Sequence, residues 1–329
     1  MRIPTIMLLL GCLLALGGCH IFGSREEKEP EYLWHKMDGL AGGKISTLAL
    51  RNDETLVVGT DTAGMYMTQS LAGPLQKVNL RNSLSITGIR EMMVRDTLFY
   101  LSTFIVNQLW SSADGKKWKF LLAKKDPMFN TWVTPEGDRI IGTWHGIYRQ
   151  AGGSSDIEQI TFLYTDYFAG LDGVTSFTQT SSGALFCGSH DGVYRSVDAG
   201  LSWKKVSHDI DKNKDDVMEL YTDPDDRIYA QTFRGLYCSD DDGGSWEQIG
   251  KLGDVGSEAQ FPGNGTVVVI TGNMVWKASL ADGDFRKIGP DQPSRYREMG
   301  AVKNGKIVVA TDSSVFVGVP NPLYTESDL

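Results

Sequence analysis

Two stretches of the chain repeat one short phrase, Ser196-Val-Asp-Ala-Gly-Leu-Ser-Trp203 and Ser239-Asp-Asp-Asp-Gly-Gly-Ser-Trp246. Both fit the pattern Ser-x-Asp-x-Gly-x-Ser-Trp without a mismatch. A looser third copy, with its aspartate one place late, is Ser111-Ser-Ala-Asp-Gly-Lys-Lys-Trp118. Aspartate accepts backbone N–H bonds inside tight turns, glycine adopts positive φ, and tryptophan offers a large apolar surface. The phrase therefore predicts a tight turn between two strands, with the tryptophan packed inward.

The phrase belongs to a longer repeat that covers most of the chain. In each repeat a strand-like apolar run ends in a small hydroxyl residue, and an aromatic residue follows five to seven positions later. The hydroxyl residues, which we call the marker hydroxyls, are Thr60, Thr103, Thr143, Ser189, Thr232, Thr271 and Thr311. The aromatic residues are Tyr66, Trp110, Tyr148, Tyr194, Tyr237, Trp276 and Phe316. Successive markers are 39 to 46 positions apart. A period of roughly 42 residues is typical of a four-stranded propeller blade, so the sequence predicts seven blades.

Within each repeat, apolar and polar residues alternate, as in Arg227-Ile-Tyr-Ala-Gln-Thr232. Such alternation is typical of half-buried strands, and Gly, Pro and Asp mark the turns. The last repeat ends near Pro320 without an outer strand, whereas Trp34-His-Lys-Met37 resembles the strand Trp203-Lys-Lys-Val206. We therefore predict an all-β protein, a seven-bladed β-propeller of four-stranded antiparallel blades, closed by an N-terminal strand at residues 32–38.

The repeated phrase resembles the Asp-box of the bacterial-neuraminidase-repeat families, which include sialidases, sortilin-type receptors and plant-type photosystem assembly factors. These families are β-propellers. The resemblance implies that the phrase closes the hairpin between the third and fourth strands of a blade, away from any ligand. It marks these residues as structural: Ser196, Asp198, Gly200, Trp203, Ser239, Asp241, Gly243, Trp246, Ser111, Asp114, Gly115 and Trp118. The match to sialidases is incomplete, because the mature chain lacks their Phe-Arg-Ile-Pro motif.

The N-terminus has the pattern of a bacterial lipoprotein. The apolar run from residue 6 to residue 16 is too short to span a bilayer but suits a signal peptide. Leu16-Gly-Gly-Cys19 resembles a lipobox, in which Cys19 receives its acyl chains, typically palmitate, and becomes the first mature residue. His20 is not the aspartate that favours inner-membrane retention, so we expect an outer-membrane anchor, on the periplasmic face or the cell surface. The predicted segments are 1–18 (signal peptide), 19–31 (lipidated cysteine and tether), 32–320 (propeller) and 321–329 (C-terminal tail).

Charge and cysteine content narrow the classes of function. The formal net charge is −9 at pH 7 and no basic run is present, so we predict no nucleic-acid partner. Cys187 and Cys238 fall on non-equivalent strands of adjacent blades, where the Cα separation of about 7 Å or less that a disulfide needs is not expected. We predict two buried free thiols and no cofactor. Residues 209–215 resemble the start of a calcium loop but lack its glycine and glutamate, so calcium stays an open alternative.

The predicted binding site lies where the turns between second and third strands meet the blade-to-blade connections, around the mouth of the central channel. Its residues are Asp61, Asn107, Trp144, His145, His190, Asp191, Phe233 and Arg234. Aromatic, imidazole, carboxylate and guanidinium groups on a concave mouth are typical of a site for a polar ligand. We predict no catalytic residue. We also predict no metal residue, because His145 and His190 have no third ligand at the spacing of a zinc site.

The sequence thus predicts a membrane-anchored lipoprotein that binds a protein or a glycan through the channel-mouth face without catalysing a reaction. Two alternatives stay open. One is a glycan-active hydrolase that uses carboxylates such as Asp61, Asp191 or Asp312. The other is an assembly or scaffold factor of an outer-membrane complex, which the resemblance to photosystem factors implies.

Overall fold

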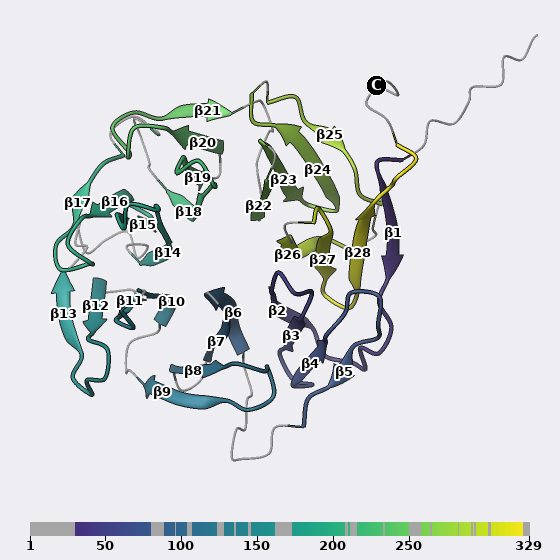
Figure 1. Cartoon of the computed structure of the whole chain (residues 1–329), viewed down its shortest axis with the longest axis horizontal. Helices are drawn as coiled ribbons and strands as arrows, with labels where there is room; N and C mark the ends of the chain where they lie inside the picture. The colour runs from purple at the N-terminus through teal and green to yellow at the C-terminus, as the bar shows by residue number, and fades with distance from the viewer. Residues whose placement is uncertain are drawn as a thin grey trace, which may run out of the picture.

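Seven four-stranded antiparallel sheets form a ring in the computed structural model (Figure 1). The structure describes residues 30–79, 89–95, 97–103, 107–123, 128–134, 136–143, 146–161, 173–207, 210, 216–232, 234–249, 258–263, 265–281, 283–290, 292, 294–301 and 304–324. Every regular element in these ranges is a strand, and the strand order within each sheet follows the chain, apart from the closing strand. The predicted seven-bladed propeller is confirmed.

The strands are assigned to blades in chain order, and the first strand of each blade is the innermost (Figure 1). Blade 1 contains β2 (Ile45–Leu50), β3 (Leu56–Thr60), β4 (Met65–Thr68) and β5 (Gln76–Lys77); blade 2 contains β6 (Ile89–Arg95), β7 (Leu98–Thr103), β8 (Gln108–Ser112) and β9 (Lys119–Ala123); blade 3 contains β10 (Met128–Val133), β11 (Arg139–Thr143), β12 (Gly146–Gln150) and β13 (Glu158–Thr161). Blade 4 contains β14 (Val174–Gln179), β15 (Leu185–Ser189), β16 (Gly192–Ser196) and β17 (Lys204–Lys205); blade 5 contains β18 (Val217–Thr222), β19 (Ile228–Thr232), β20 (Gly235–Ser239) and β21 (Glu247–Ile249). Blade 6 contains β22 (Glu258–Gly263), β23 (Thr266–Thr271), β24 (Met274–Ser279) and β25 (Arg286–Lys287); blade 7 contains β26 (Tyr296–Ala301), β27 (Ile307–Thr311), β28 (Val315–Pro320) and the closing strand β1 (Tyr32–Lys36).

The closing strand β1 pairs with β28 in antiparallel register, from Tyr32 opposite Pro320 to Lys36 opposite Phe316. The Trp34 indole Nε1 donates a 2.7 Å hydrogen bond to the Ile288 carbonyl of blade 6. Just before β1, the Glu31 carboxylate forms ion pairs with Lys277 Nζ (2.6 Å) and Arg286 Nε (2.8 Å) of the same blade. The predicted closure is confirmed, and its contacts extend one residue ahead of the predicted start at residue 32.

The marker hydroxyls close the turns between second and third strands. Each is the last residue of its second strand. The Thr143 hydroxyl donates to the Gly146 carbonyl at 3.0 Å, Ser189 to Gly192 at 3.1 Å and Thr232 to Gly235 at 3.2 Å. Ser and Thr hydroxyls favour such local bonds to the backbone in turns. The repeated hydroxyl is therefore a turn-closing group, which explains why it recurs once per blade.

Glycine precedes the marker in three blades because the neighbouring blade approaches closely there. A Cβ at Gly142 would lie 2.5 Å from Val174 Cγ1, and one at Gly188 would lie 2.8 Å from Val217 Cγ1. Val174 and Val217 each begin the innermost strand of the next blade. Seven apolar clusters among the described residues fill the seven blade-to-blade interfaces. The core is therefore divided among the interfaces, and glycine sets the blade spacing at the centre.

The two regular copies of the repeated phrase form hairpins with matching hydrogen bonds. Asp198 accepts from the Ser196 hydroxyl at 2.7 Å and from the Ser202 N–H at 2.8 Å. Asp241 accepts from the Ser239 hydroxyl at 2.9 Å and from the Ser245 N–H at 2.8 Å. Both hairpins connect the third and fourth strands of their blades, as predicted. Trp203 and Trp246 pack into the interface with the preceding blade.

The looser third copy differs from the prediction in its serine. The hydroxyl that donates to Asp114, at 3.1 Å, belongs to Ser112 and not to Ser111. Counted from Ser112, the aspartate is in the regular position and the turn is one residue shorter, so that Gly115 follows Asp114 directly. Asp114 also accepts the N–H groups of Lys116 and Lys117, both at 2.8 Å. The turn keeps its function despite the shift.

Both cysteines of the described residues are free thiols, as predicted, with Cys187 buried in β15 and Cys238 half-buried in β20. At the C-terminal end, Asn321 is buried, and its N–H donates to the Glu31 carbonyl at 2.9 Å. Its side-chain Nδ2 donates to the Pro30 carbonyl at 2.8 Å. Contacts of the ring therefore reach one residue past the predicted end at residue 320.

Candidate binding site

A hollow of about 530 Å³ lies at the junction of blades 7 and 1, on the face that carries the second-to-third-strand turns and the blade connections. Four segments line it: the turns after β3 and β27, and the first residues of β2 and β26 with the connection residue just before each strand. Its lining residues are Lys44, Ile45, Ser46, Asp61, Arg295, Tyr296, Arg297, Glu298 and Asp312. The hollow is on the predicted face, and Asp61 is the predicted site residue that it contains.

Charged side chains dominate the hollow. Lys44, Arg295 and Arg297 are exposed cations, and Arg297 forms an ion pair with Asp312. Asp61 accepts the Lys44 N–H at 2.8 Å and the Thr62 hydroxyl at 3.0 Å. The backbone N–H of Lys44 is the largest cause that lowers the pKa of Asp61 below its usual value. Asp61 is therefore ionised at neutral pH and held in place by its own turn.

A second feature lies on the seven innermost strands and meets the hollow at Glu298. On each strand one residue is opposite the position just before the marker hydroxyl: Thr47, Glu91, Asn130, Ser176, Glu219, Glu258 and Glu298. We call these seven residues the inner belt. In six blades a β-bulge directly precedes the belt residue. A bulge bends its strand and re-aims the side chains that follow it. Four of the seven equivalent positions thus carry a glutamate.

Hydrogen bonds from the inner belt run to the next blade. The Thr47 hydroxyl oxygen accepts the Met92 N–H of blade 2 at 3.0 Å. Glu258 accepts the Met299 N–H of blade 7, and Glu298 accepts from the Leu48 N–H and the Thr47 hydroxyl of blade 1. These bonds satisfy backbone donors on innermost strands, so the belt ties adjacent blades together at the centre of the ring.

Burial and crowding keep two belt glutamates protonated. Burial raises the pKa of Glu258 well above its usual range, and the neighbouring Glu298 and Glu219 raise it further. Burial is also the first cause at Glu298, and with the nearby Glu91 it raises the pKa of Glu298 to about 8. A carboxyl group below its pKa is mostly neutral, so Glu298 carries a proton at pH 7. The hollow therefore contains three cations, two carboxylates and one neutral carboxyl group at that pH.

The predicted arc on blades 3 to 5 has a different character where it is described. His190 Nδ1 lies 3.0 Å from Asp216 Oδ1. Asp191 accepts from the Tyr194 hydroxyl and from Lys205 Nζ. These side chains are engaged with one another within blades 4 and 5. Arg234 is exposed on the equivalent turn of blade 5, and Asn107 adopts a positive φ of 45° before β8. Trp144, His145, Phe233 and the lipid-site Cys19 lie outside the described residues, as does the possible calcium segment 209–215 apart from residue 210.

The hollow lies in another sector of the ring than the predicted arc of blades 3 to 5. Lys44, Arg295, Arg297 and Glu298 line the hollow and were not among the predicted site residues. A usable pattern was present, because Arg295 and Arg297 lie on either side of Tyr296, the first residue of β26, while Asp312 and Asp61 follow the markers of blades 7 and 1. Ring closure makes these two blades neighbours, so the four segments converge although residues 44 and 312 are at opposite ends of the domain.

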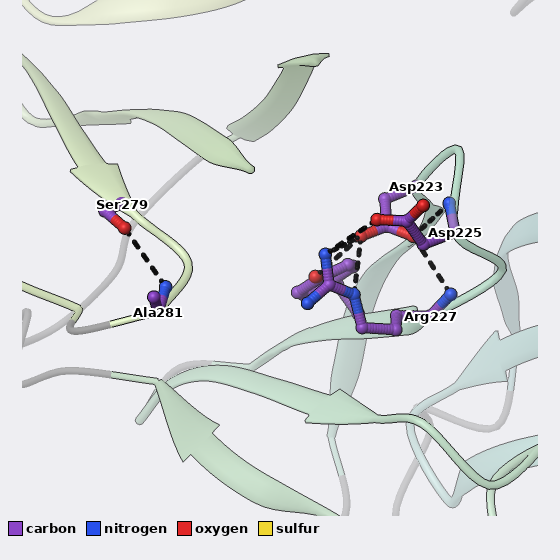
Figure 2. A network of polar contacts seen from close by, with 6 residues as sticks. Asp223, Asp225, Arg227, Ser279 and Ala281 are labelled. Atoms are coloured by element: carbon purple, nitrogen blue, oxygen red, sulfur yellow. Dashed lines mark hydrogen bonds and ion pairs between the residues drawn. The ribbon is translucent and has the colours of Figure 1, made fainter. Parts of the chain in front are cut away.

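A smaller hollow of about 260 Å³ lies on the opposite face, between blades 5 and 6. Figure 2 shows Asp223, Asp225 and Arg227 on one side of this region and Ser279 with Ala281 on the other. Asp223 accepts from the Asp225 N–H at 2.9 Å, from Arg227 Nε at 2.8 Å and from the Tyr229 hydroxyl at 2.9 Å. The buried carboxylate is engaged by its own turn and strand, so this network stabilises the turn.

Neither a metal-binding cluster nor a membrane-spanning helix is present in the described part of the chain. No group of three or more His, Cys, Asp or Glu side chains there could hold a metal ion. Over the same residues, no helix has the length and apolar character needed to cross a membrane.

Comparisons with known proteins establish the fold. No protein-family model matches the chain, and no curated protein matches it significantly. Among solved structures, the chain is similar to the extracellular domain of the BT3049 hybrid two-component system from B. thetaiotaomicron (TM-score 0.66, 14% identity, 89% of this chain) but spans only 41% of that chain. It is also similar to virginiamycin B lyase from Staphylococcus aureus with quinupristin (TM-score 0.70, 11% identity, 88% and 100% of the two chains). A third similar structure is YCF48 bound to a D1 peptide (TM-score 0.66, 11% identity, 89% and 96%). At these identities the likeness extends to the propeller fold alone.

Proposed function

We propose that this protein is a non-catalytic binding protein that holds an acidic segment of a partner protein in the hollow at the junction of blades 7 and 1. The observation that carries the proposal is the set of exposed cations, Lys44, Arg295 and Arg297, around one concave site. Asp61 and Asp312 offset two of the three charges, and the protonated Glu298 leaves the third uncompensated at pH 7. The hollow is thus locally positive on a chain whose net charge is −9. Electrostatic complementarity of this kind favours selection of an acidic partner.

The scaffold suits this function. The seven interfaces make a rigid ring, and the hollow is built from turns and connections, which are the parts of a fold that vary most freely between proteins. A protein of similar fold, YCF48, has a solved structure in which it is bound to a D1 peptide, and the BT3049 structure is that of an extracellular domain. These neighbours support a binding or scaffold role for the fold and leave the partner of this chain to experiment. The regular hydrogen bonds of Asp198 and Asp241 support the narrower proposal that the chain is an Asp-box propeller.

Site-specific photo-crosslinking tests the binding proposal. A photoreactive amino acid replaces Thr62, an exposed and uncharged residue beside Asp61 of the hollow, or, as the matched control, the exposed Asp225 on the opposite face. Illumination of cells that express the full chain should give one dominant protein adduct from position 62 and none from position 225. Equal adducts from both positions, or none from position 62, would contradict binding through this hollow.

We further propose that Cys19 is lipidated and anchors the protein to the outer membrane. The lipobox-like sequence supports this, and the described chain begins at Pro30 beside the closing strand, so an anchor would connect to the ring at its closure. Metabolic labelling with palmitate should mark the wild type and not Cys19→Ala. Label on the Cys19→Ala variant, or a wild type without label, would argue against the anchor.

A glycan-active hydrolase is the second candidate. The hollow combines a carboxyl group of raised pKa, Glu298, with the ionised Asp61 and with Asp312, and such pairs can serve as general acid and base. Asp191, also considered for this chemistry, is engaged with Tyr194 and Lys205 outside the hollow. Glycan turnover by the purified protein that disappears in Glu298→Gln would favour the hydrolase over the binding protein.

A further inference from the structure

Glu298 belongs both to the hollow and to the inner belt. It lines the hollow together with Arg295 and Arg297. Its carboxyl group accepts hydrogen bonds from the Leu48 N–H and the Thr47 hydroxyl, which fix it against blade 1. The bulge between Tyr296 and Glu298 produces this placement. The belt carboxylates therefore influence the protonation of Glu298, and its protonation sets the charge that a ligand in the hollow meets.

The groups around Glu298 have a defined pattern of charge. Glu91 on β6 is the main neighbouring carboxylate, and Glu258 on β22 is electrostatically coupled to Glu298. Glu219 and Tyr221 on β18 lie further round the belt, and Arg90 is beside Glu91. On the side of the hollow Glu298 faces Lys44, Arg295, Arg297, Asp61 and Asp312. Acidic groups therefore dominate on the belt side and cations on the ligand side.

We propose that Glu298 is a specificity-determining residue whose proton controls whether the hollow accepts an acidic ligand, an inference that rests on the proposed function. When the carboxyl group is protonated, the three cations exceed the two carboxylates of the hollow by one charge. When it loses its proton to solvent, the charges balance and the new carboxylate repels an anionic ligand. Because binding and proton uptake are linked, an acidic ligand that favours the protonated form also raises the pH at which Glu298 ionises.

A binding titration with a labelled octaglutamate peptide tests this inference, with octaglutamine as the matched neutral peptide. For a bound peptide that raises the pKa of Glu298 by one unit from about 8, the full chain should bind octaglutamate at pH 6.5 and lose about fivefold in affinity by pH 9, with a limit of about tenfold at still higher pH. Octaglutamine should bind more weakly and without the pH dependence. Arg295→Ser should weaken octaglutamate binding at both pH values, whereas Asp225→Asn on the opposite face should change nothing.

Two belt variants distinguish control by Glu298 from a general effect of pH. Glu298→Gln should keep the low-pH affinity at pH 9. Glu91→Gln removes the carboxylate that raises the pKa of Glu298, so the midpoint of the wild-type pH profile should move to lower pH. Circular dichroism and thermal melting show whether each variant is folded. If Glu298→Gln does not fold, the pH midpoint of Glu91→Gln tests the inference, and an unshifted midpoint contradicts it.

Several outcomes overturn the inference. A wild-type affinity that does not change between pH 6.5 and 9 does so, as does a Glu298→Gln variant that retains the wild-type pH dependence. Failure of octaglutamate to bind, together with a specific protein adduct from position 62, overturns the control by Glu298 while the binding function stands. Failure of both experiments removes the proposed function as well.

Discussion

Single residues determine both the turns and the charge of this protein. The marker hydroxyls were identified from the sequence, and each lies at the end of a second strand because its hydroxyl closes the next turn. Glu298 could not be identified in the same way. Its raised pKa depends on a bulge in its own strand and on Glu91 from a strand about 200 positions away in the sequence, and neither is visible in a local pattern.

The raised pKa of Glu298 predicts a pH dependence of stability. The folded-state pKa of about 8 lies above the ordinary value of 4.5 for an exposed glutamate. Between these values the folded protein retains a proton that the unfolded chain releases, so this group lowers the free energy of unfolding as pH rises, by at most about 1.4 kcal/mol per pH unit. Urea denaturation from pH 5 to pH 8 should show this decline in the wild type relative to Glu298→Gln. Parallel curves for the two proteins would contradict it.

Trp246 supports the ring rather than the ligand. Its side chain is 7% exposed and packs between blades 4 and 5, on the far side of the ring from the hollow. Trp246→Ala should lower the free energy of unfolding by about 3–5 kcal/mol, as expected for loss of a large buried side chain. Octaglutamate affinity of the folded variant should equal that of the wild type. A loss of affinity with unchanged stability would show that the assignment is wrong.

At the scale of elements, strand order and closure followed from the sequence, whereas the hollow between blades 7 and 1 did not. Alternating apolar and polar residues in a regular repeat predict strands. The strand-like segment at Trp34 lies ahead of the first repeat and predicts the outer strand that the last repeat lacks. The hollow depends on how closure brings the segment before β2 beside the segment before β26. The clustered aromatic and histidine residues of blades 3 to 5 were the stronger local pattern, yet His190 and Asp191 are engaged in ion pairs and hydrogen bonds of their own.

The closing strand is expected to hold the whole ring together. Deletion of residues 31–38 removes the pairing of β1 with β28, the Trp34 bond to Ile288 and the Glu31 ion pairs with blade 6. The melting temperature should fall by many degrees, because blades 7 and 6 lose contacts together and the edge of β28 becomes unpaired. Deletion of residues 21–28, of equal length and ahead of the described ring, is the matched control. An unchanged melting temperature after the first deletion would refute the role of β1.

At the scale of the whole molecule, the ring is uniform in its backbone and uneven in its charge. The fold can be predicted from the sequence because the same kinds of hydroxyl, aromatic and turn residues recur in every blade. Function depends on departures from the repeat. Belt positions that are Thr, Asn or Ser in three blades are Glu in the other four, and the cations of the hollow are confined to blades 7 and 1. These departures have no period, so they become meaningful only when the ring is assembled.

Hydrogen–deuterium exchange of the full chain with and without octaglutamate at pH 6.5 tests the binding site most directly. Exchange should become slower at residues 44–46 and 295–298 when the peptide binds, with no change at residues 223–227 on the opposite face. Protection of the opposite face, or of the His190 sector in place of the junction between blades 7 and 1, would contradict it.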